Sequence, residues 1–320
     1  MVVTIVVLVI GLLALIKGAD WLVDGASALA KQFGVPTLVI GLTIVAFGTS
    51  MPELLVNVVA AMKWNSDIAF GNVMWSNIAN ILLILWVTGL ITTLKVQKDT
   101  TWKEIPFALL AMLVLFVLSN TMLLDGTATN ILTKSWGVIL LLLFAIFLYY
   151  VYESTKKAPD TDDDTPVPSM SYPKMALFIV GGLLGLYFGG TWTVDSAVKI
   201  AEYFGLSDFL ISTTIIAIGT SLPELVTSVA AARKKSVDLA VGNIIGSNIF
   251  NIFWILWVTA LIRPIPLPVG ANMDLLVGTL ATILLFLFMF IGKRHTLQRR
   301  QSVLFILLYI VYVVIVIMRG

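Results

Sequence analysis

The chain has 320 residues, of which 59% are hydrophobic and only 12% are charged, and its mean hydropathy is +1.01. Because soluble domains carry about twice that share of charged residues, the composition excludes an ordinary soluble protein and indicates a polytopic membrane protein in the lipid bilayer. The net charge of +2 says little about partners, but no basic cluster of the nucleic-acid-binding type is present, so we expect no nucleic acid as a partner. The absence of cysteine excludes disulfides and thiolate metal sites.

Ten segments have the length of about 20 apolar residues that a membrane-spanning helix needs. We expect them at residues 2–26, 35–62, 67–92, 104–123, 134–153, 173–203, 207–232, 237–262, 270–292 and 301–318. The first segment lacks the basic region and cleavage site of a signal peptide, so we interpret it as an uncleaved helix. Residues 154–172 are polar and rich in Pro and Asp, which predicts a flexible linker. The acidic run Asp162–Asp164 lies in this linker. We favour a solvated linker over the alternative that this run binds a regulatory cation.

The linker divides the ten expected helices into two groups of five, in residues 1–153 and 173–320. Because five is odd, the second group enters the membrane upside down, which makes an inverted repeat of the kind common in transporters. Loops after odd-numbered helices, together with the linker, hold most of the basic residues: Lys31, Lys95, Lys98, Lys103, Lys156, Lys157, Lys174, Arg233, Lys234, Lys235, Lys293, Arg294, Arg299 and Arg300. The positive-inside rule therefore predicts a cytoplasmic linker and both termini outside the cell membrane.

One pair of motifs occurs twice. Gly48-Thr-Ser-Met-Pro-Glu53 recurs as Gly219-Thr-Ser-Leu-Pro-Glu224, and Gly71-Asn-Val-Met-Trp-Ser-Asn-Ile-Ala-Asn80 recurs as Gly242-Asn-Ile-Ile-Gly-Ser-Asn-Ile-Phe-Asn251. Both offsets equal 171, since 224 − 53 and 251 − 80 give the same number. Residues 33–92 and 204–263 align without a gap and share about half of their residues, which predicts one backbone performing one task twice.

Pro52 predicts a break in the second helix. Proline lacks an N–H and its ring clashes with the carbonyl four residues earlier, while Gly48 tolerates a distorted backbone. Ser50-x-x-Glu53 is a capping-box pattern, so we expect a new half-helix to begin there and the carbonyls of residues 46–49 to lose their partners. The repeated motif predicts the same break in the seventh helix.

Glu53 and Glu224 are candidate cation ligands, because an isolated carboxylate at the centre of a membrane helix costs at least ~2.5–3.5 kcal/mol. Thr49 and Ser50 lie three or four residues before Glu53 and share its helix face. Asn72, Ser76 and Asn80 form a second stripe spaced by four, and Asn243, Ser247 and Asn251 form its copy. Two carboxylates with amide, hydroxyl and carbonyl oxygens supply the 6 to 8 hard ligands that Ca²⁺ prefers. The candidate set contains no His or Cys, which argues against Zn or Cu.

The two predicted acids also suggest how ion fluxes are coupled. Adjacent carboxylates in a low-dielectric site cannot both stay ionised when the site is empty, so cations or protons must enter. One Ca²⁺ or two Na⁺ neutralise the pair, and a loaded site crosses the membrane more easily than a charged empty one. This asymmetry predicts an exchanger. We also hypothesise that protons compete with cations at Glu53 and Glu224, so transport should weaken at acid pH.

The paired motifs resemble the two alpha repeats of the cation/Ca²⁺ exchanger superfamily, most closely its Na⁺/Ca²⁺ exchanger branch of prokaryotic or archaeal type. The resemblance implies ion sites between the second, third, seventh and eighth of ten helices. It implies that Glu53 and Glu224, with the carbonyls of Thr49 and Thr220, bind Ca²⁺. For Na⁺ it implies the same glutamates with a further set: Ser50, Ser221, Ser76, Ser247 and the carbonyls of Ala46 and Ala217.

Two positions depart from the family pattern. Asn251 stands where K⁺-dependent members have Asp, which favours K⁺-independent exchange. Trp75 stands where the family motif and the second copy, at Gly246, have Gly. We hypothesise that Trp75 crowds the first-half site or biases one conformation.

The predicted function is a secondary active antiporter that exchanges Na⁺ for Ca²⁺ by alternating access. We expect a functional monomer without a cofactor, Ca²⁺ and Na⁺ being transported substrates. A Ca²⁺/H⁺ exchanger is the alternative within the class, and a cation channel is the alternative outside it. An enzyme is disfavoured because the lone histidine, His295, lies in a basic loop and no nucleophile–base motif is present.

Overall fold

The structure is a computed structural model of the chain and describes residues 1–156, 169–206 and 215–319. In the first half the elements are α1 (Val2–Phe33), α2 (Thr37–Ile40), η1 (Gly41–Val45), α3 (Ala46–Thr49), α4 (Met51–Met62), α5 (Ser66–Ala79), η2 (Asn80–Ile84), α6 (Leu85–Ile91), β1 (Leu94–Lys95), η3 (Thr100–Glu104), α7 (Ile105–Ser119), α8 (Thr121–Asp125), β2 (Ile131–Leu132) and α9 (Lys134–Thr155). In the second half they are α10 (Tyr172–Tyr203), α12 (Ala217–Thr220), α13 (Leu222–Arg233), α14 (Val237–Ile249), η5 (Phe250–Ile255), α15 (Leu256–Ile262), β3 (Ile265–Pro266), α16 (Ala271–Phe288), β4 (Thr296–Leu297) and α17 (Arg299–Arg319). Elements labelled η are π-helical turns, which are frequent at functional sites.

The expected helix boundaries agree with these elements to within a few residues, with α1 as the largest difference. It was expected to end at residue 26 but continues to Phe33, because nothing between them breaks a helix. Gly34 ends it with a left-handed φ of 64°, and its N–H returns to the carbonyls of Ala30 and Lys31. The start of the expected seventh helix, most of the linker and Asp162–Asp164 lie outside the described residues.

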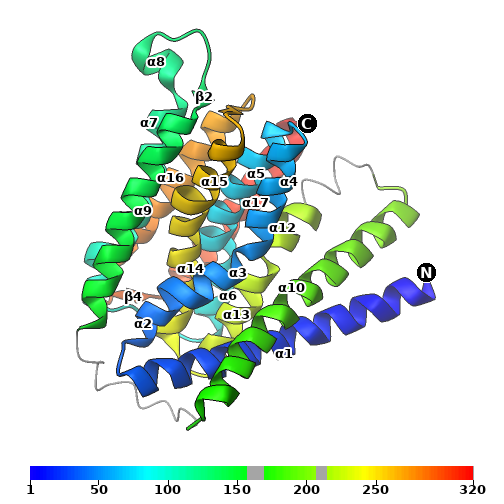
Figure 1. Cartoon of the computed structure of the whole chain (residues 1–320), viewed down its shortest axis with the longest axis vertical. Helices are drawn as coiled ribbons and strands as arrows, with labels where there is room; N and C mark the ends of the chain where they lie inside the picture. Colours follow the sequence, from blue (N-terminus) through cyan, green and yellow to red (C-terminus); the bar gives the residue numbers. More distant parts are fainter. Residues whose placement is uncertain (157–168, 207–214, 320) are drawn as a thin grey trace.

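Membrane-spanning helices dominate the part of the chain that the structure describes. Eight are long and apolar enough to cross a bilayer, and a ninth is present if Thr37–Thr49 and Met51–Met62 are one bent span. Two short antiparallel pairs tie the connecting loops together: β1 with β4, and β2 with β3. These pairs lie at opposite ends of the bundle (Figure 1), so the loops alternate between two sides.

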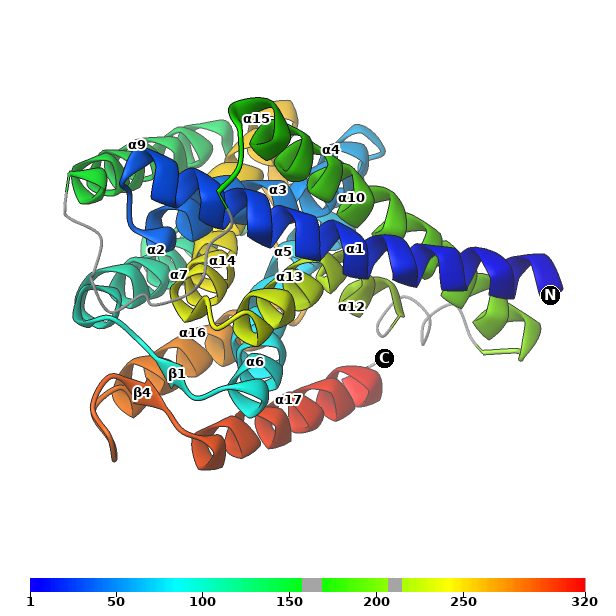
Figure 2. The same ribbon diagram turned by 90° about the horizontal axis from the view of Figure 1, so that it is seen from below.

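Helices α1 and α10 run side by side along one face of the bundle (Figures 1 and 2). Glycines allow this contact: a Cβ atom on Gly182 would lie 2.7 Å from the backbone nitrogen of Leu22 and 2.8 Å from the carbonyl oxygen of Gly18. Small residues at such a crossing bring two backbones together, as is common between membrane helices.

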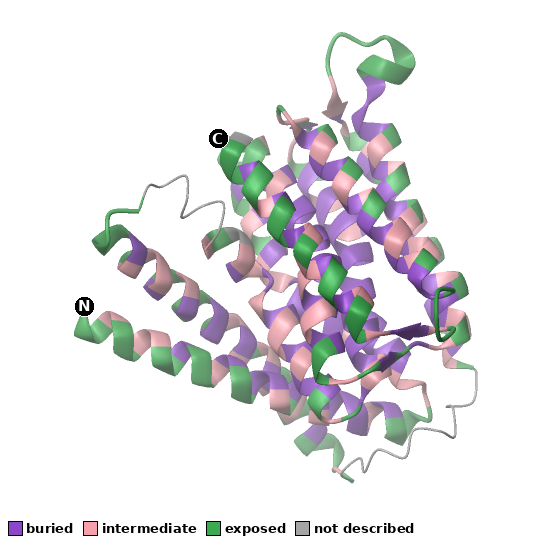
Figure 3. Ribbon diagram, turned by 180° about the vertical axis from the view of Figure 1, so that it is seen from behind, coloured by how far each residue is buried: buried purple, intermediate pink, exposed green. Residues whose placement is uncertain are grey.

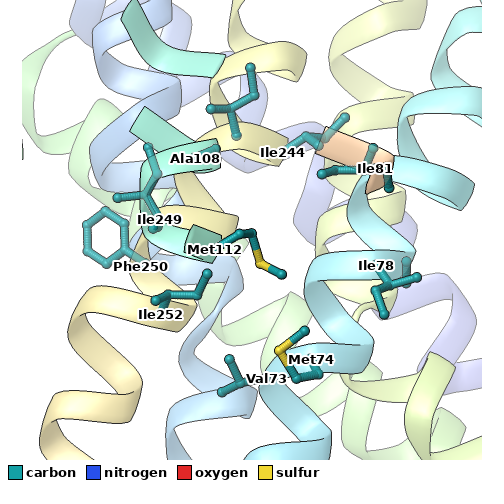
Figure 4. Packing of buried hydrophobic residues seen from close by; sticks show 14 of the residues in the cluster. Val73, Met74, Ile78, Ile81, Ala108, Met112, Ile244, Ile249, Phe250 and Ile252 are labelled. Atoms are coloured by element: carbon teal, nitrogen blue, oxygen red, sulfur yellow. The ribbon is translucent and has the colours of Figure 1, made fainter. Parts of the chain in front are cut away.

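The core lies around α5, α14 and the two π-helical turns that follow them. Figure 4 shows Met74 and Ile78 of α5 near Met112 of α7, with Ile244 and Ile249 of α14 nearby. The buried residues concentrate in these central helices, whereas the outer helices expose apolar side chains (Figure 3). Such an exterior suits lipid, and the centre is where the repeated motifs lie.

Candidate cation site

The helix break predicted at Pro52 lies at Ser50, between α3 and α4. Ser50 has φ −85° and ψ 8°, and the two helical pieces are bent by 44°. Ser221, between α12 and α13, has nearly the same conformation, with φ −87° and ψ 5°. Proline follows within the first two positions of both new helices. The repeated motif therefore produces the same local backbone twice.

The capping-box prediction for Ser50 is wrong. Its side chain makes no capping hydrogen bond; instead, the Oγ hydroxyl donates to Oε1 of Glu224 at 3.0 Å. A hydrogen bond to a carboxylate is about twice as strong as a neutral one, so the carboxylate of the other half sets the direction in which the Ser50 hydroxyl donates.

Hydroxyl groups connect the two acids across the halves. Glu53 and Glu224 are 0% and 1% exposed. Oε1 of Glu53 accepts from Ser76 at 3.1 Å, and the Ser221 hydroxyl donates to Ser76 at 3.2 Å. Oε1 of Glu224 also accepts from Ser247, at 3.4 Å. Glu224 is therefore bonded by both halves, whereas Glu53 is bonded by its own half and reaches the other half through Ser76.

Four oxygen atoms of the two acids and of Asn80 and Asn251, which follow Ser76 and Ser247 by four residues, are buried and accept no hydrogen bond. They are Oε2 of Glu53, Oε2 of Glu224, Oδ1 of Asn80 and Oδ1 of Asn251. The four residues are at most 1% exposed. Burying a polar acceptor without a partner is costly, and burying a carboxylate oxygen more so. Such oxygens suit a cation, which provides the positive charge that no protein donor supplies.

The predicted ligands Thr49, Ala46, Thr220 and Ala217 differ in their positions and hydrogen-bond partners. The buried Thr49 hydroxyl donates to Oδ1 of Asn243 at 3.0 Å and lies 3.4 Å from the Ser247 hydroxyl. The carbonyl of Ala46 was expected to lose its partners, but it accepts from the Ser50 N–H at 3.1 Å. Thr220 and Ala217 form the ends of the short helix α12 beside the second break. The break therefore frees fewer carbonyls than expected, because Ser50 still closes a helical turn.

Asn72 and Asn243, which begin the two predicted stripes, bond to the backbone carbonyls of the acids. Asn72 donates to the carbonyl of Glu53 at 3.2 Å, and Asn243 donates to the carbonyl of Glu224 at 3.4 Å. Asn72 also donates to Oδ1 of Asn57 at 2.7 Å, and Asn243 also donates to Oγ of Ser228 at 3.0 Å. Sequence reasoning missed Asn57 and Ser228. They differ by 228 − 57 = 171, so the repeat offset was the signal that could have found them.

Sequence reasoning also missed two further asparagines and one acid. Asn77 donates to the carbonyl of Asn248 in the other half. The side chains of Asn248 and Asn77 accept from Asn80 and Asn251, respectively. Glu104 is 1% exposed and accepts a hydrogen bond from Tyr150, away from this cluster in η3. No group of three or more His, Cys, Asp or Glu residues that could hold a metal occurs in the described ranges. The donor set is therefore two carboxylates with amide and hydroxyl oxygens, which suits hard cations.

Comparison with known proteins gives the family of the chain. The family model described as sodium/calcium exchanger protein matches residues 3–153 and 174–318. Inner membrane protein YrbG of Escherichia coli is 39% identical, over 80% of this chain and 79% of its own length. Sodium/calcium exchanger MaX1 of Methanosarcina acetivorans is 31% identical, over 98% of both chains. The solved structure of the sodium-calcium exchanger NCX_Mj superposes with a TM-score of 0.84 at 33% identity, covering 98% of this chain and 99% of the other.

The fold and the comparisons together define a multi-span membrane transport protein with two acids buried among its central helices. The chain belongs to the sodium/calcium exchanger family. This confirms the resemblance that the paired motifs indicated.

Proposed function

We propose that the protein is a secondary active antiporter that exchanges Na⁺ for Ca²⁺ by alternating access at one shared oxygen site. The observation that carries the proposal is the set of four buried acceptors without donors: the second oxygens of Glu53 and Glu224 and the amide oxygens of Asn80 and Asn251. Their two negative charges are matched by one Ca²⁺ or two Na⁺, so the same oxygens serve either ion in turn.

The remaining ligands in this proposal surround those oxygens. Ser50, Ser76, Ser221 and Ser247 already bond to the acids or to each other, and their oxygen lone pairs are available to Na⁺. The carbonyls of Thr49 and Thr220 complete the Ca²⁺ shell, and those of Ala46 and Ala217 serve Na⁺. Resemblance to the family supports these carbonyl roles.

The proposed architecture has ten spans in two inverted repeats, 1–153 and 173–320, with the second and seventh spans broken. The 44° bend at Ser50 and the matching conformation of Ser221 support the breaks. The basic loops favour a cytoplasmic linker at 154–172, termini outside the cell membrane and, with all ligands in one chain, a functional monomer.

Counter-ion dependence tests the function. Protein reconstituted in liposomes should take up ⁴⁵Ca²⁺ when Na⁺ is loaded inside and diluted outside, and should not when choline replaces Na⁺. Uptake driven by a pH gradient without Na⁺ would favour the Ca²⁺/H⁺ alternative, and non-saturable flux without a counter-ion would favour a channel.

Glutamine variants connect the flux to the site. Glu53→Gln and Glu224→Gln should each abolish Na⁺-dependent uptake, because each removes one of two charges. The matched control is Glu104→Gln, a buried acid outside the cluster whose oxygen still accepts from Tyr150. Normal uptake in both site variants would reject the site.

A further inference from the structure

Four asparagines form a closed hydrogen-bond network between the halves. Asn80 donates its amide N–H to Oδ1 of Asn248 at 2.9 Å, and Asn251 donates to Oδ1 of Asn77 at 3.0 Å. Asn77 donates in turn to the backbone carbonyl of Asn248 at 3.5 Å, and Asn248 donates to that of Asn77 at 3.3 Å. All four residues are buried.

The direction of every amide in this network follows from the two backbone carbonyls. A carbonyl only accepts, so the NH₂ groups of Asn77 and Asn248 must face it, and their Oδ1 atoms must face away. Those Oδ1 atoms then require donors, which are the NH₂ groups of Asn251 and Asn80. The remaining atoms, Oδ1 of Asn80 and Oδ1 of Asn251, are the two amide oxygens without a donor.

We propose that Asn77 and Asn248 are positioning residues, each of which turns the carbonyl oxygen of the opposite half's ligand, Asn251 or Asn80, toward the cation. The inference rests on the proposed cation site and deepens it. Because Oδ1 of Asn77 needs a donor at position 251, an ionised aspartate there faces an acceptor. The network therefore selects a neutral amide and keeps the charge of the site at two.

A double-mutant cycle on Ca²⁺ binding by the purified full chain tests this positioning. Asn77→Ala and Asn251→Ala should each weaken binding by about tenfold, and the double variant should be little weaker than Asn251→Ala alone. The cross-half pairs 77/251 and 248/80 should each show at least about fivefold coupling, because contacting residues are coupled. For the same-half pairs 77/80 and 248/251, the Ca²⁺ affinity of the double variant should lie within about twofold of the value expected if the two single effects are independent.

Additional measurements separate positioning from a loss of fold. Asn77→Ser removes the amide acceptor but keeps a hydroxyl donor for the Asn248 carbonyl, so it should weaken Ca²⁺ binding with an unchanged ion-free melting temperature. Unchanged Ca²⁺ affinity in the Asn77 and Asn248 variants, or equal coupling in same-half pairs, would overturn the inference while the proposed function stands. A wild-type protein that binds no Ca²⁺ would overturn the proposed function itself.

An ion pair on α1 carries a second, independent inference. The Lys234 ammonium, at the end of α13, lies 2.8 Å from Asp24 and 3.5 Å from Asp20 and donates to the Asp20 carbonyl at 2.9 Å. It therefore fastens α1 to α13. The repeat offset takes Asp24 to Asp195 on α10 and Lys234 back to Lys63 at the end of α4, since 195 − 24 and 234 − 63 both equal 171.

The Asp24–Lys234 ion pair is formed in this structure, whereas its counterpart, Lys63 with Asp195, is not. Lys63 and Asp195 are exposed, and neither has an ion pair with any residue that the structure describes. We infer that the two pairs are alternating latches: Asp24–Lys234 holds one side closed, and Lys63–Asp195 forms when the halves exchange conformations. One latch is then broken for each one made, which keeps the two states close in free energy.

Side-specific Ca²⁺ dependence in oriented proteoliposomes tests the latches. Lys234→Gln should lower half-saturating Ca²⁺ on the Lys234 side and raise it on the other, each by about two- to fivefold, as expected for partly exposed ion pairs. Lys63→Gln should shift both values in the opposite directions, and Asp24→Asn should add nothing to Lys234→Gln. Shifts in the same direction for both lysine variants, or no shift, would overturn the latches without touching the cation site.

Discussion

Ser50 and Glu224 come from opposite halves of the chain, yet the serine hydroxyl donates to the carboxylate at 3.0 Å. Because Ser50 lies at the break between α3 and α4, the backbone irregularity of one half is joined directly to the acid of the other. A movement of either half must therefore change the surroundings of Glu224. This hydrogen bond therefore connects the break of the first half directly to the acid that follows the break of the second.

Removing that hydroxyl should weaken cation binding. A hydrogen bond to a charged group contributes ~1.5–3 kcal/mol, which corresponds to roughly tenfold or more in affinity. We expect Ser50→Ala to raise half-saturating Ca²⁺ by about that factor in the uptake assay. Ser119→Ala, a buried serine of α7 outside the cluster, is the control. Equal effects of the two variants would contradict a specific role for Ser50.

Acidification should inhibit transport through competition at Glu53 and Glu224. Protons neutralise the same carboxylates that a cation neutralises, so Ca²⁺ uptake under a constant Na⁺ gradient should fall from neutral pH to about pH 5. Raising Ca²⁺ should restore the rate, because the two cations compete. A rate that stays flat over this range would exclude the competition.

The acids and the break were predictable because their motifs repeat at one offset, but the capping box predicts the wrong hydrogen bond for Ser50. The capping-box pattern describes a local partner, whereas the partner that binds Ser50 lies 174 residues away. Asn72 lies on the predicted stripe with Ser76 and Asn80, and only three-dimensional packing shows that it donates to the Glu53 carbonyl. Periodicity predicts which face a residue occupies, and not which of several polar neighbours it binds.

The crossing of α1 and α10 should not tolerate a side chain at Gly182. A Cβ there would meet the Leu22 backbone nitrogen at 2.7 Å, and overpacking of this kind costs ~1–3 kcal/mol. We expect Gly182→Ala to lower the melting temperature in detergent. Gly71→Ala is the control, since no heavy atom lies within 4 Å of its added Cβ and alanine favours the helix. Equal melting temperatures for the two variants would contradict the close contact.

Trp75 packs against α17, which predicts a role in stability. Its ring lies 5.1 Å from that of Tyr312, whose hydroxyl donates to Asp274 of α16 at 3.1 Å. Trp75→Ala should lower the free energy of unfolding by ~3–5 kcal/mol. Trp64→Ala, at a residue that is 77% exposed and whose ring contacts the side chain of Arg263, should change it by about 1 kcal/mol or less. An unchanged stability with a lower half-saturating Ca²⁺ would instead support crowding of the site by Trp75.

Equilibrium binding of ⁴⁵Ca²⁺ to the purified protein tests the central claim, that one cation is shared by the two buried acids. The account predicts saturable binding in the wild type and in Glu104→Gln, no saturable binding in Glu53→Gln or Glu224→Gln, and displacement of Ca²⁺ by Na⁺. Wild-type affinity in either site variant, or Ca²⁺ binding that Na⁺ leaves unchanged, would contradict it.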